Sequence, residues 1–112
     1  MSEIQRVMKL LEDNSIQPKR AFGQNFLIDE SIIEKIINSL NVENYETVLE
    51  IGPGLGALTI PLRKKAKRMI AVEADRDMAS ILSKELKDSE NITLINERSE
   101  EHTSELQSHV MI

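Results

Sequence analysis

Apolar residues recur at helical spacing in two segments near the amino terminus, each behind a capping-box pattern. The first pattern is Ser2 with Gln5, and the second is Ser31 with Glu34. The apolar residues that follow are Ile4, Val7, Met8 and Leu11 in the first segment and Ile32, Ile33, Ile36, Ile37 and Leu40 in the second. This spacing predicts two amphipathic helices, the second ending near residue 41. Residues 16–28 follow neither period, and we expect a structured loop there.

From residue 47 the pattern changes to short apolar runs separated by turn residues. The predicted strands are residues 47–51, 69–73 and 92–95, and the predicted helices between them are one that ends near residue 67 and one at residues 75–87. The positions expected to face the core from these helices are Leu58, Leu62, Ala66, Met78, Ala79, Leu82 and Leu86. Strand, helix, strand, helix, strand indicates a parallel sheet, and hence an α/β fold that resembles the N-terminal half of a Rossmann-like domain.

The composition is that of one small globular domain. The chain has 112 residues and a mass of 12.7 kDa, with 40% hydrophobic and 29% charged residues. No apolar run approaches the roughly 18–20 residues that a membrane span needs, and the first residues lack the features of a secretion signal. The chain has no cysteine for a disulfide. We therefore expect a cytoplasmic protein without membrane attachment.

The distribution of charge and histidine limits the possible chemistry. Residues 1–97 hold 13 basic and 16 acidic residues, and residues 98–112 hold one basic and three acidic ones. Both histidines, His102 and His109, lie in the second of these segments. The first 97 residues therefore exclude a zinc site, a Ser-His-Asp triad and a Cys-His nucleophile, and we expect no metal.

A glycine-rich turn separates the first predicted strand from the next helix. Gly52, Gly54 and Ala57 fit the nucleotide-binding pattern in its form with alanine last, and Glu73 ends the second strand 21 residues after Gly52. Glycines let the backbone approach a ligand closely, and a strand-end carboxylate can accept hydrogen bonds from ribose hydroxyls. The two features favour a nucleoside-containing cofactor. The alternative is a tight turn beside a solvated glutamate.

NAD and S-adenosylmethionine both fit that pattern, and Glu50 is the residue that decides which of the two cofactors the sequence favours. This residue lies two positions before the first glycine and places a carboxylate at the end of the first strand. Residues 48–59, Val-Leu-Glu-Ile-Gly-Pro-Gly-Leu-Gly-Ala-Leu-Thr, resemble the first cofactor motif of S-adenosylmethionine-dependent methyltransferases. Dehydrogenases seldom carry that acid and the Gly-Pro-Gly step. S-adenosyl-L-methionine is therefore the predicted cofactor.

Two further blocks extend the resemblance: Phe-Gly-Gln-Asn-Phe-Leu-Ile-Asp at residues 22–29 and Ala-Val-Glu-Ala-Asp-Arg-Asp at residues 71–77. In the order and spacing of all three blocks, residues 17–97 resemble the KsgA-type family of rRNA adenine N6,N6-dimethyltransferases. The related erythromycin-resistance branch of large-subunit rRNA adenine methyltransferases shares these blocks and is the nearest alternative. An NAD-dependent dehydrogenase fragment and a non-catalytic nucleotide-binding module are the remaining ones.

The resemblance implies a function and a set of site residues. The function is transfer of two methyl groups from S-adenosylmethionine to the N6 amine of adenines in small-subunit ribosomal RNA, a step of ribosome biogenesis whose partners are that RNA and the small ribosomal subunit. Asn25 and Leu27 would contact the methionine end of the cofactor, and Gly52, with Gly54 behind it, the bend in its chain. Glu73 would hold the ribose.

The remaining motifs of that family do not occur in this chain. Arg98 stands where the resemblance places the aspartate that binds the cofactor adenine, and the Asn-Leu-Pro-Tyr segment that grips the target amine is absent. The sequence therefore predicts no catalytic residue, and we expect the chain to be inactive alone. Because the predicted sheet ends at residue 95, we expect residues 47–51 to form an edge strand without a partner, which favours association.

Residues 98–112 are predicted as a separate unit after a truncated methyltransferase domain at residues 1–97. Residues 98–108, Arg-Ser-Glu-Glu-His-Thr-Ser-Glu-Leu-Gln-Ser, have no apolar period and resemble the translation of a sequencing-library adapter along their whole length. We therefore expect a non-native or disordered tail that is not part of the methyltransferase domain.

Two basic clusters are candidate contacts for RNA phosphates. They are Lys19 with Arg20, and residues 63–68, of which five are Lys or Arg. Lysine and arginine that neutralise phosphates dominate the affinity of proteins for nucleic acids. A charge run on a helix face is more often simply solvated, and that alternative stays open here.

Overall fold

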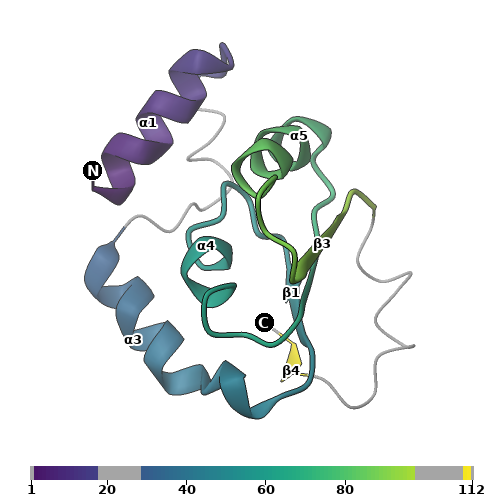
Figure 1. Cartoon of the computed structure of the whole chain (residues 1–112). Helices are drawn as coiled ribbons and strands as arrows, with labels where there is room; N and C mark the ends of the chain where they lie inside the picture. The colour runs from purple at the N-terminus through teal and green to yellow at the C-terminus, as the bar shows by residue number, and fades with distance from the viewer. Residues whose placement is uncertain (1, 18–28, 98–109, 112) are drawn as a thin grey trace.

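The chain forms a parallel sheet with helices packed against it (Figure 1). The computed structural model describes residues 2–17, 29–97 and 110–111. The strands are β1 (Val48–Ile51), β2 (Met69–Val72), β3 (Ile92–Ile95) and β4 (Val110–Met111), in the spatial order β3-β2-β1-β4. β2 pairs in parallel with both β1 and β3. The predicted α/β class with a parallel, Rossmann-like sheet is confirmed.

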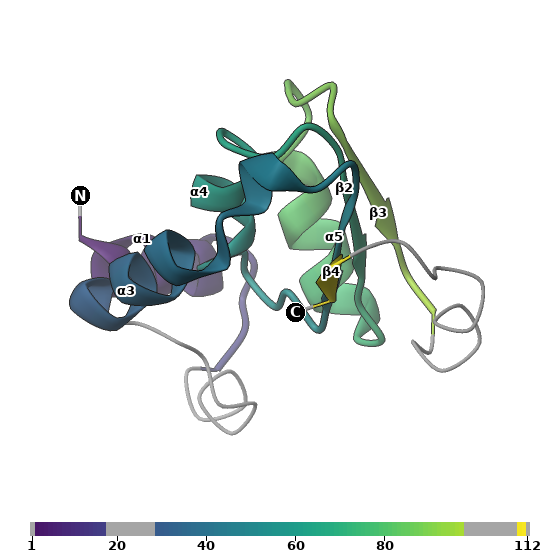
Figure 2. The ribbon, with the colours of Figure 1, turned by 90° about the horizontal axis from the view of Figure 1, so that it is seen from below.

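Helices α1 (Glu3–Asp13) and α3 (Glu30–Leu40) precede the sheet, and Figure 2 shows them on the same side of it as α4. The predicted capping box starts α1: the Ser2 hydroxyl accepts the Gln5 N–H at 3.2 Å, and the Gln5 side chain accepts the Ser2 N–H at 2.9 Å. No helix in the described part of the chain is long and apolar enough to cross a membrane.

The predicted start of the second helix at Ser31 is wrong, because Asp29 is the N-cap. Its carboxylate accepts the Ser31 hydroxyl and the backbone N–H groups of Ile32 and Ser31, and these bonds hold the pKa of Asp29 below its ordinary value. An ionised acceptor binds backbone N–H groups more strongly than a hydroxyl does, and the Ser31 hydroxyl is itself a donor to Asp29, so the helix begins two residues earlier than predicted. On the predicted apolar face, Ile33 and Ile37 are buried, but Ile32 is 45% exposed.

The helix predicted up to residue 67 is much shorter, since α4 spans only Thr59–Leu62. Pro61 is the third residue of α4, in its first turn, where a missing backbone N–H removes no bond within the helix, so Pro61 does not end the helix. Beyond α4 the chain closes into tight turns, in which the Lys64 N–H donates to the Pro61 carbonyl at 3.3 Å and the Lys65 N–H to the Leu62 carbonyl at 2.9 Å. The positions predicted to face the core still do so: Leu58, Leu62 and Ala66.

Helix α5 (Arg76–Glu85) connects β2 to β3 and starts at Asp75, as predicted. The Asp75 carboxylate accepts the N–H groups of Asp77 and Met78 at 2.8 and 3.1 Å. The predicted inward positions Met78, Ala79, Leu82 and Leu86 are all buried. Ile81 is buried as well, which the sequence analysis did not predict.

Two clusters of buried apolar residues lie within the part of the chain that the structure describes. One joins α3 to β1, α4 and β2, and its buried residues are Ile33, Ile37, Val42, Val48, Leu62, Ala66 and Met69. The other joins α1 to α5 through Leu55, and its buried residues are Val7, Leu11, Leu55, Met78 and Ile81. The segment between β1 and α4 therefore lies where the two clusters meet.

β4 pairs in parallel with β1, with Val110 opposite Val48 and Met111 opposite Leu49. The prediction that residues 47–51 form an edge without a partner is wrong for these two positions, because the unpaired N–H and C=O groups of a strand edge bind any strand that reaches them. The tail thus contributes a short strand that the sequence analysis did not expect. For residues 98–109, which lie outside the described residues, the non-native or disordered tail stays a prediction.

Candidate cofactor site

The glycine turn, residues 52–58, begins where β1 ends and leads into α4. Gly52 and Gly54 have φ angles of 68° and 58°, in the left-handed region where a side chain is strained. Gly52 is exposed, and a Cβ built on it would meet no atom within 4 Å. Its α-carbon therefore faces open space, which leaves room for the chain of a bound cofactor.

Gly56, in the same turn, has a different structural role, because its α-carbon lies close to neighbouring side chains. Its φ is 87°, and a Cβ there would lie 2.7 Å from Leu82 Cδ1 and 3.2 Å from Ile60 Cδ1. The absence of a side chain thus lets α5 pack closely on the turn. Ala57 was expected to occupy the third place of the motif, whereas Gly56 is the residue that makes the close approach. The signal that could have found it is the third glycine of Gly-Pro-Gly-Leu-Gly.

Glu73 follows β2, and its carboxylate reaches the glycine turn. Oε1 accepts the backbone N–H of Gly54 at 2.8 Å, and Oε2 accepts that of Asp75 at 2.9 Å. The Asn96 side chain, which follows β3, donates to the Glu73 carbonyl at 2.6 Å. Glu73 is 7% exposed, so it is not a solvated strand end. Each carboxylate oxygen keeps a further lone pair that can accept a hydroxyl of a ligand.

Glu50 is a second buried carboxylate, 4% exposed, on β1. Thr59, the first residue of α4, donates its hydroxyl to Glu50 Oε1 at 2.5 Å. Burial raises the pKa of Glu50 to about 7, the bond from Thr59 opposes this rise, and the charge of Glu73 adds to it. Two acids thus lie at the ends of neighbouring strands, and a cation placed near them would favour the ionised form of Glu50. Sequence reasoning located Glu50 but missed Thr59.

Helix α1 supports the turn through Arg6. Its Nη2 donates to the backbone carbonyl of Leu55 at 2.8 Å. Glu3 holds the same guanidinium in two bonds, of 2.9 and 2.6 Å. Since Leu55 is buried against α1 and α5, both its backbone and its side chain fix the middle of the turn. Nothing in the sequence pattern relates Arg6 to a residue 49 positions away.

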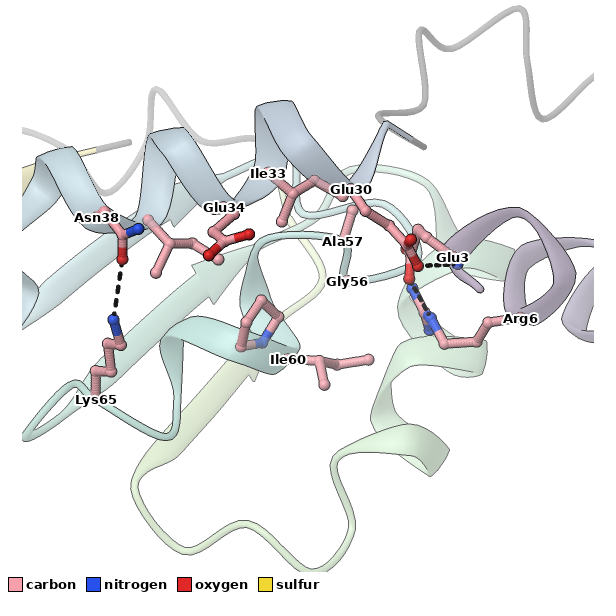
Figure 3. Close-up of a pocket in the computed structure, with 12 residues that line it drawn as sticks. Glu3, Arg6, Glu30, Ile33, Glu34, Asn38, Gly56, Ala57, Ile60 and Lys65 are labelled. Carbon is pink, nitrogen blue, oxygen red and sulfur yellow. Dashed lines mark hydrogen bonds and ion pairs between the residues drawn. The ribbon is translucent and has the colours of Figure 1, made fainter. Parts of the chain in front are cut away.

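A cavity of about 370 Å³ lies beside the turn, between α1, α3 and α4 (Figure 3). Gly56 and Ala57 form part of its wall. Its apolar lining comes from Ile33, Ile37, Ile60 and Pro61. At one end Lys65 Nζ donates to Asn38 Oδ1 at 3.3 Å. The predicted cofactor residues of the described chain do not line this cavity, so it is a separate place from the candidate cofactor site.

Three of the five predicted site residues, Gly52, Gly54 and Glu73, are described, and the structure brings them to one end of the sheet. Asn25 and Leu27 lie outside the described residues, and their contacts stay a prediction. Within the described ranges, no group of three or more His, Cys, Asp or Glu side chains is arranged to hold a metal ion.

A parallel sheet whose first strand leads into a glycine turn, with a buried acid bonded to that turn from the second strand, defines a domain of the Rossmann-like class. Within that class, the chain belongs to the ribosomal RNA adenine dimethylase family, whose model matches residues 16–99. The family predicted from the three sequence blocks is confirmed.

The relatives agree with this assignment. The chain is 52% identical over 81 residues to the ribosomal RNA small subunit methyltransferase A of Mycoplasmopsis pulmonis, covering 72% of this chain and 31% of the relative. It is 44% identical over 92 residues to the methyltransferase of the same name from Staphylococcus carnosus, and the match covers 82% of this chain and 31% of that relative. The crystal structure of the 23S rRNA methyltransferase ErmE matches with a TM-score of 0.59 and 33% identity, over 64% of this chain and 30% of ErmE. The chain thus spans about a third of the length of its curated relatives.

Proposed function

We propose that this chain is the cofactor-binding part of an S-adenosylmethionine-dependent enzyme that dimethylates the N6 amine of adenines in small-subunit ribosomal RNA. The observation that carries the cofactor assignment is the pair of buried carboxylates beside the glycine turn, Glu50 and Glu73. Glu73 suits the ribose of either cofactor, but Glu50 adds a second carboxylate, which attracts the sulfonium cation of S-adenosylmethionine and repels the pyrophosphate of NAD. The charge of the site therefore favours S-adenosylmethionine where the glycine pattern leaves both cofactors open.

Each residue has a definite task in the proposed site. Gly52 leaves room for the bend of the cofactor, and Glu73 accepts the ribose hydroxyls with the lone pairs that Gly54 and Asp75 do not use. Asn25 and Leu27 hold the methionine end. The bound cofactor supplies the methyl group. Because the nitrogen of an aromatic amine is a poor nucleophile, holding the donor in line with it is the main contribution of these residues.

The choice of small-subunit RNA as substrate is supported by the identities. The two relatives described as small-subunit methyltransferases are 52% and 44% identical to the chain, whereas ErmE, which acts on 23S rRNA, is 33% identical. A large-subunit, erythromycin-resistance-type methyltransferase is the second candidate, because ErmE shares the fold of the site. For either substrate the proposed location is the cytoplasm, where bacterial ribosomes are assembled.

Titration calorimetry with S-adenosylhomocysteine and NAD tests the cofactor assignment. We expect the chain to bind S-adenosylhomocysteine and not NAD. Glu73→Ala should weaken that binding by about 1–3 kcal/mol, the range for losing hydrogen bonds to a charged acceptor. Glu46→Ala, which removes an exposed carboxylate, is the matched control and should leave the affinity unchanged. Preferential binding of NAD, or an unchanged affinity in Glu73→Ala, contradicts the assignment.

A chimera tests the reaction and its substrate. Residues 16–97 of this chain would replace the matching segment of the Mycoplasmopsis pulmonis relative, and transfer of labelled methyl groups would be measured on small and large ribosomal subunits. We expect methylation of the small subunit, and loss of it when the chimera carries Glu73→Ala. A chimera that binds S-adenosylhomocysteine but methylates neither subunit would support a non-catalytic binding module instead.

A further inference from the structure

The basic turn, residues 63–68, is the strongest concentration of positive charge in the chain. Five of its six residues are Lys or Arg, although the chain as a whole has a net charge of −5. Ala66 is buried and anchors the segment, whereas Lys64, Lys67 and Arg68 are exposed. No ion pair within the described ranges neutralises these three cations. They are therefore available to an outside anion.

The backbone of the basic turn is held by several hydrogen bonds. The Asn91 side chain donates to the carbonyls of Arg63 and Ala66, at 2.7 and 3.0 Å. The Arg68 carbonyl accepts the N–H of Val48 at 2.9 Å, which joins the turn to β1. The cations therefore project from a fixed backbone, and less conformational entropy is lost when they bind a ligand.

A cleft of about 380 Å³ lies between the basic turn and the start of β3. Lys67 and Arg68 line one part of it, and Asn91 and Thr93 another. Thr93 is exposed and offers a hydroxyl to an anion. Glu90 is the acid that lines the cleft in the described chain. Two cations beside a hydroxyl suit a phosphate group, which takes charge-assisted hydrogen bonds from both kinds of donor.

This cleft and the candidate cofactor site lie at opposite ends of the parallel sheet. Arg68 directly precedes β2, and Glu73 directly follows it. A strand of four residues spans roughly 13 Å at about 3.3 Å per residue. An anion held by Lys67 and Arg68 is therefore too far from the cofactor end to belong to the nucleotide that reacts there.

We propose that the basic turn is an RNA-binding surface separate from the candidate cofactor site, in which Lys64, Lys67 and Arg68 hold phosphates of the ribosomal RNA that flanks the target adenine. This inference rests on the proposed function for the identity of the RNA. The role of the basic turn is to position the RNA: it fixes how the RNA lies across the sheet and makes no contact that depends on the identity of a base. Contacts of this kind set affinity and register, and they make binding salt-dependent.

Filter binding of the chain to deproteinised small-subunit rRNA between 50 and 200 mM salt tests the proposal. We expect Lys67→Gln with Arg68→Gln to weaken binding about tenfold and to reduce the slope of log affinity against log salt by about 1.5. The pair Lys67→Arg with Arg68→Lys keeps both charges and should bind like the unaltered chain. Lys9→Gln with Lys35→Gln removes two exposed cations from α1 and α3 and should weaken binding less than twofold.

Three outcomes would overturn the proposal: an unaltered chain that does not bind the RNA, an equal loss in both glutamine pairs, or no loss in either. Calorimetry with S-adenosylhomocysteine distinguishes a failure of this proposal from a failure of the proposed function. The Lys67 and Arg68 variants should bind it with unchanged affinity, and a changed affinity would contradict a role limited to RNA. Failure of the unaltered chain to bind S-adenosylhomocysteine counts against the proposed function alone.

Discussion

At the carboxyl end of the sheet, Glu50 and Glu73 are buried and their oxygens are bonded to Thr59, Gly54 and Asp75. At the amino end, the charged residues of the basic turn other than Arg63 are exposed, and none of Lys64, Lys67 and Arg68 forms an ion pair within the described chain. The two ends differ in the sign of their charge, in burial and in backbone shape.

This difference shows how the chain divides two kinds of recognition. Buried acids in a water-poor site act over short distances and select a small ligand by its charge and shape. Exposed cations act on a long polyanion, and their effect falls with salt. Because the acids at the carboxyl end are buried and hydrogen-bonded, we expect substitutions there to change the stability of the fold strongly. Substitutions of exposed side chains at the amino end should change it little.

The largest expected effect on stability is that of Glu50→Gln. The pKa of Glu50 is raised from 4.5 to about 7 in the folded chain, so the folded state binds more protons than the unfolded state between these values. Stability should then fall as the pH rises from about 4.5 to about 7 and stay lower above it. Glutamine can still accept the Thr59 hydroxyl but does not ionise.

Urea unfolding at pH 4.5 and pH 8 measures this effect. At pH 8 the Glu50→Gln chain should be more stable than the unaltered chain by on the order of 3 kcal/mol, and near pH 4.5 the two should agree. Glu46→Gln removes an exposed carboxylate and should show no such pH-dependent gap. The same gap at both pH values would contradict the role of ionisation.

Alanine at the glycines of the turn should have the next largest effect. Gly56→Ala combines a left-handed backbone with a close approach to Leu82, and we expect a loss of about 2–3 kcal/mol in unfolding free energy. Gly52→Ala has the backbone strain without the steric contact and should cost about 1 kcal/mol. Denaturant melts of both variants give the difference. Equal losses would show that Leu82 moves away without cost.

Asn91→Ala, at the amino end of the sheet, should have a smaller effect than Glu50→Gln or Gly56→Ala. It removes the side-chain bonds to the carbonyls of Arg63 and Ala66, and we expect a loss of about 1–2 kcal/mol. Lys64→Gln, an exposed change in the same region, should alter stability by less than about 0.5 kcal/mol. If Lys64→Gln proves as costly as Asn91→Ala in thermal melts, the exposed cations at this end contribute to the fold itself.

The sequence pattern predicted the features that depend on interactions between residues close to each other in the sequence. The Ser2–Gln5 capping box, the apolar face of α5 and the bounds of β3 were all predicted from spacing and are confirmed. The start of α3 was not, because Asp29 and Ser31 are both good N-cap residues and spacing alone does not decide which of them caps the helix.

Contacts that form only after the glycine turn brings β1, β2 and α4 together could not be predicted from the sequence. Residue types and spacing located Gly52, Gly54 and Glu73, but the bond from the Gly54 N–H to Glu73 needs β1 and β2 to be paired first. The bond from Thr59 to Glu50 likewise forms only when the turn brings α4 back over the end of β1. The length of α4 was overestimated because Leu58, Leu62 and Ala66 keep a helical spacing, although the N–H groups of Lys64 and Lys65 bond to carbonyls three residues back instead of four.

The bond from Arg6 to the Leu55 carbonyl has a consequence for local unfolding. If α1 detaches, the glycine turn loses this bond at its middle, and Leu55 loses the apolar cover of Val7 and Leu11. The turn and α1 should therefore open as one cooperative unit. In native-state hydrogen exchange, the Gly56 amide, bonded to the Pro53 carbonyl at 2.9 Å, should share the opening free energy of the α1 amides rather than that of the central strands.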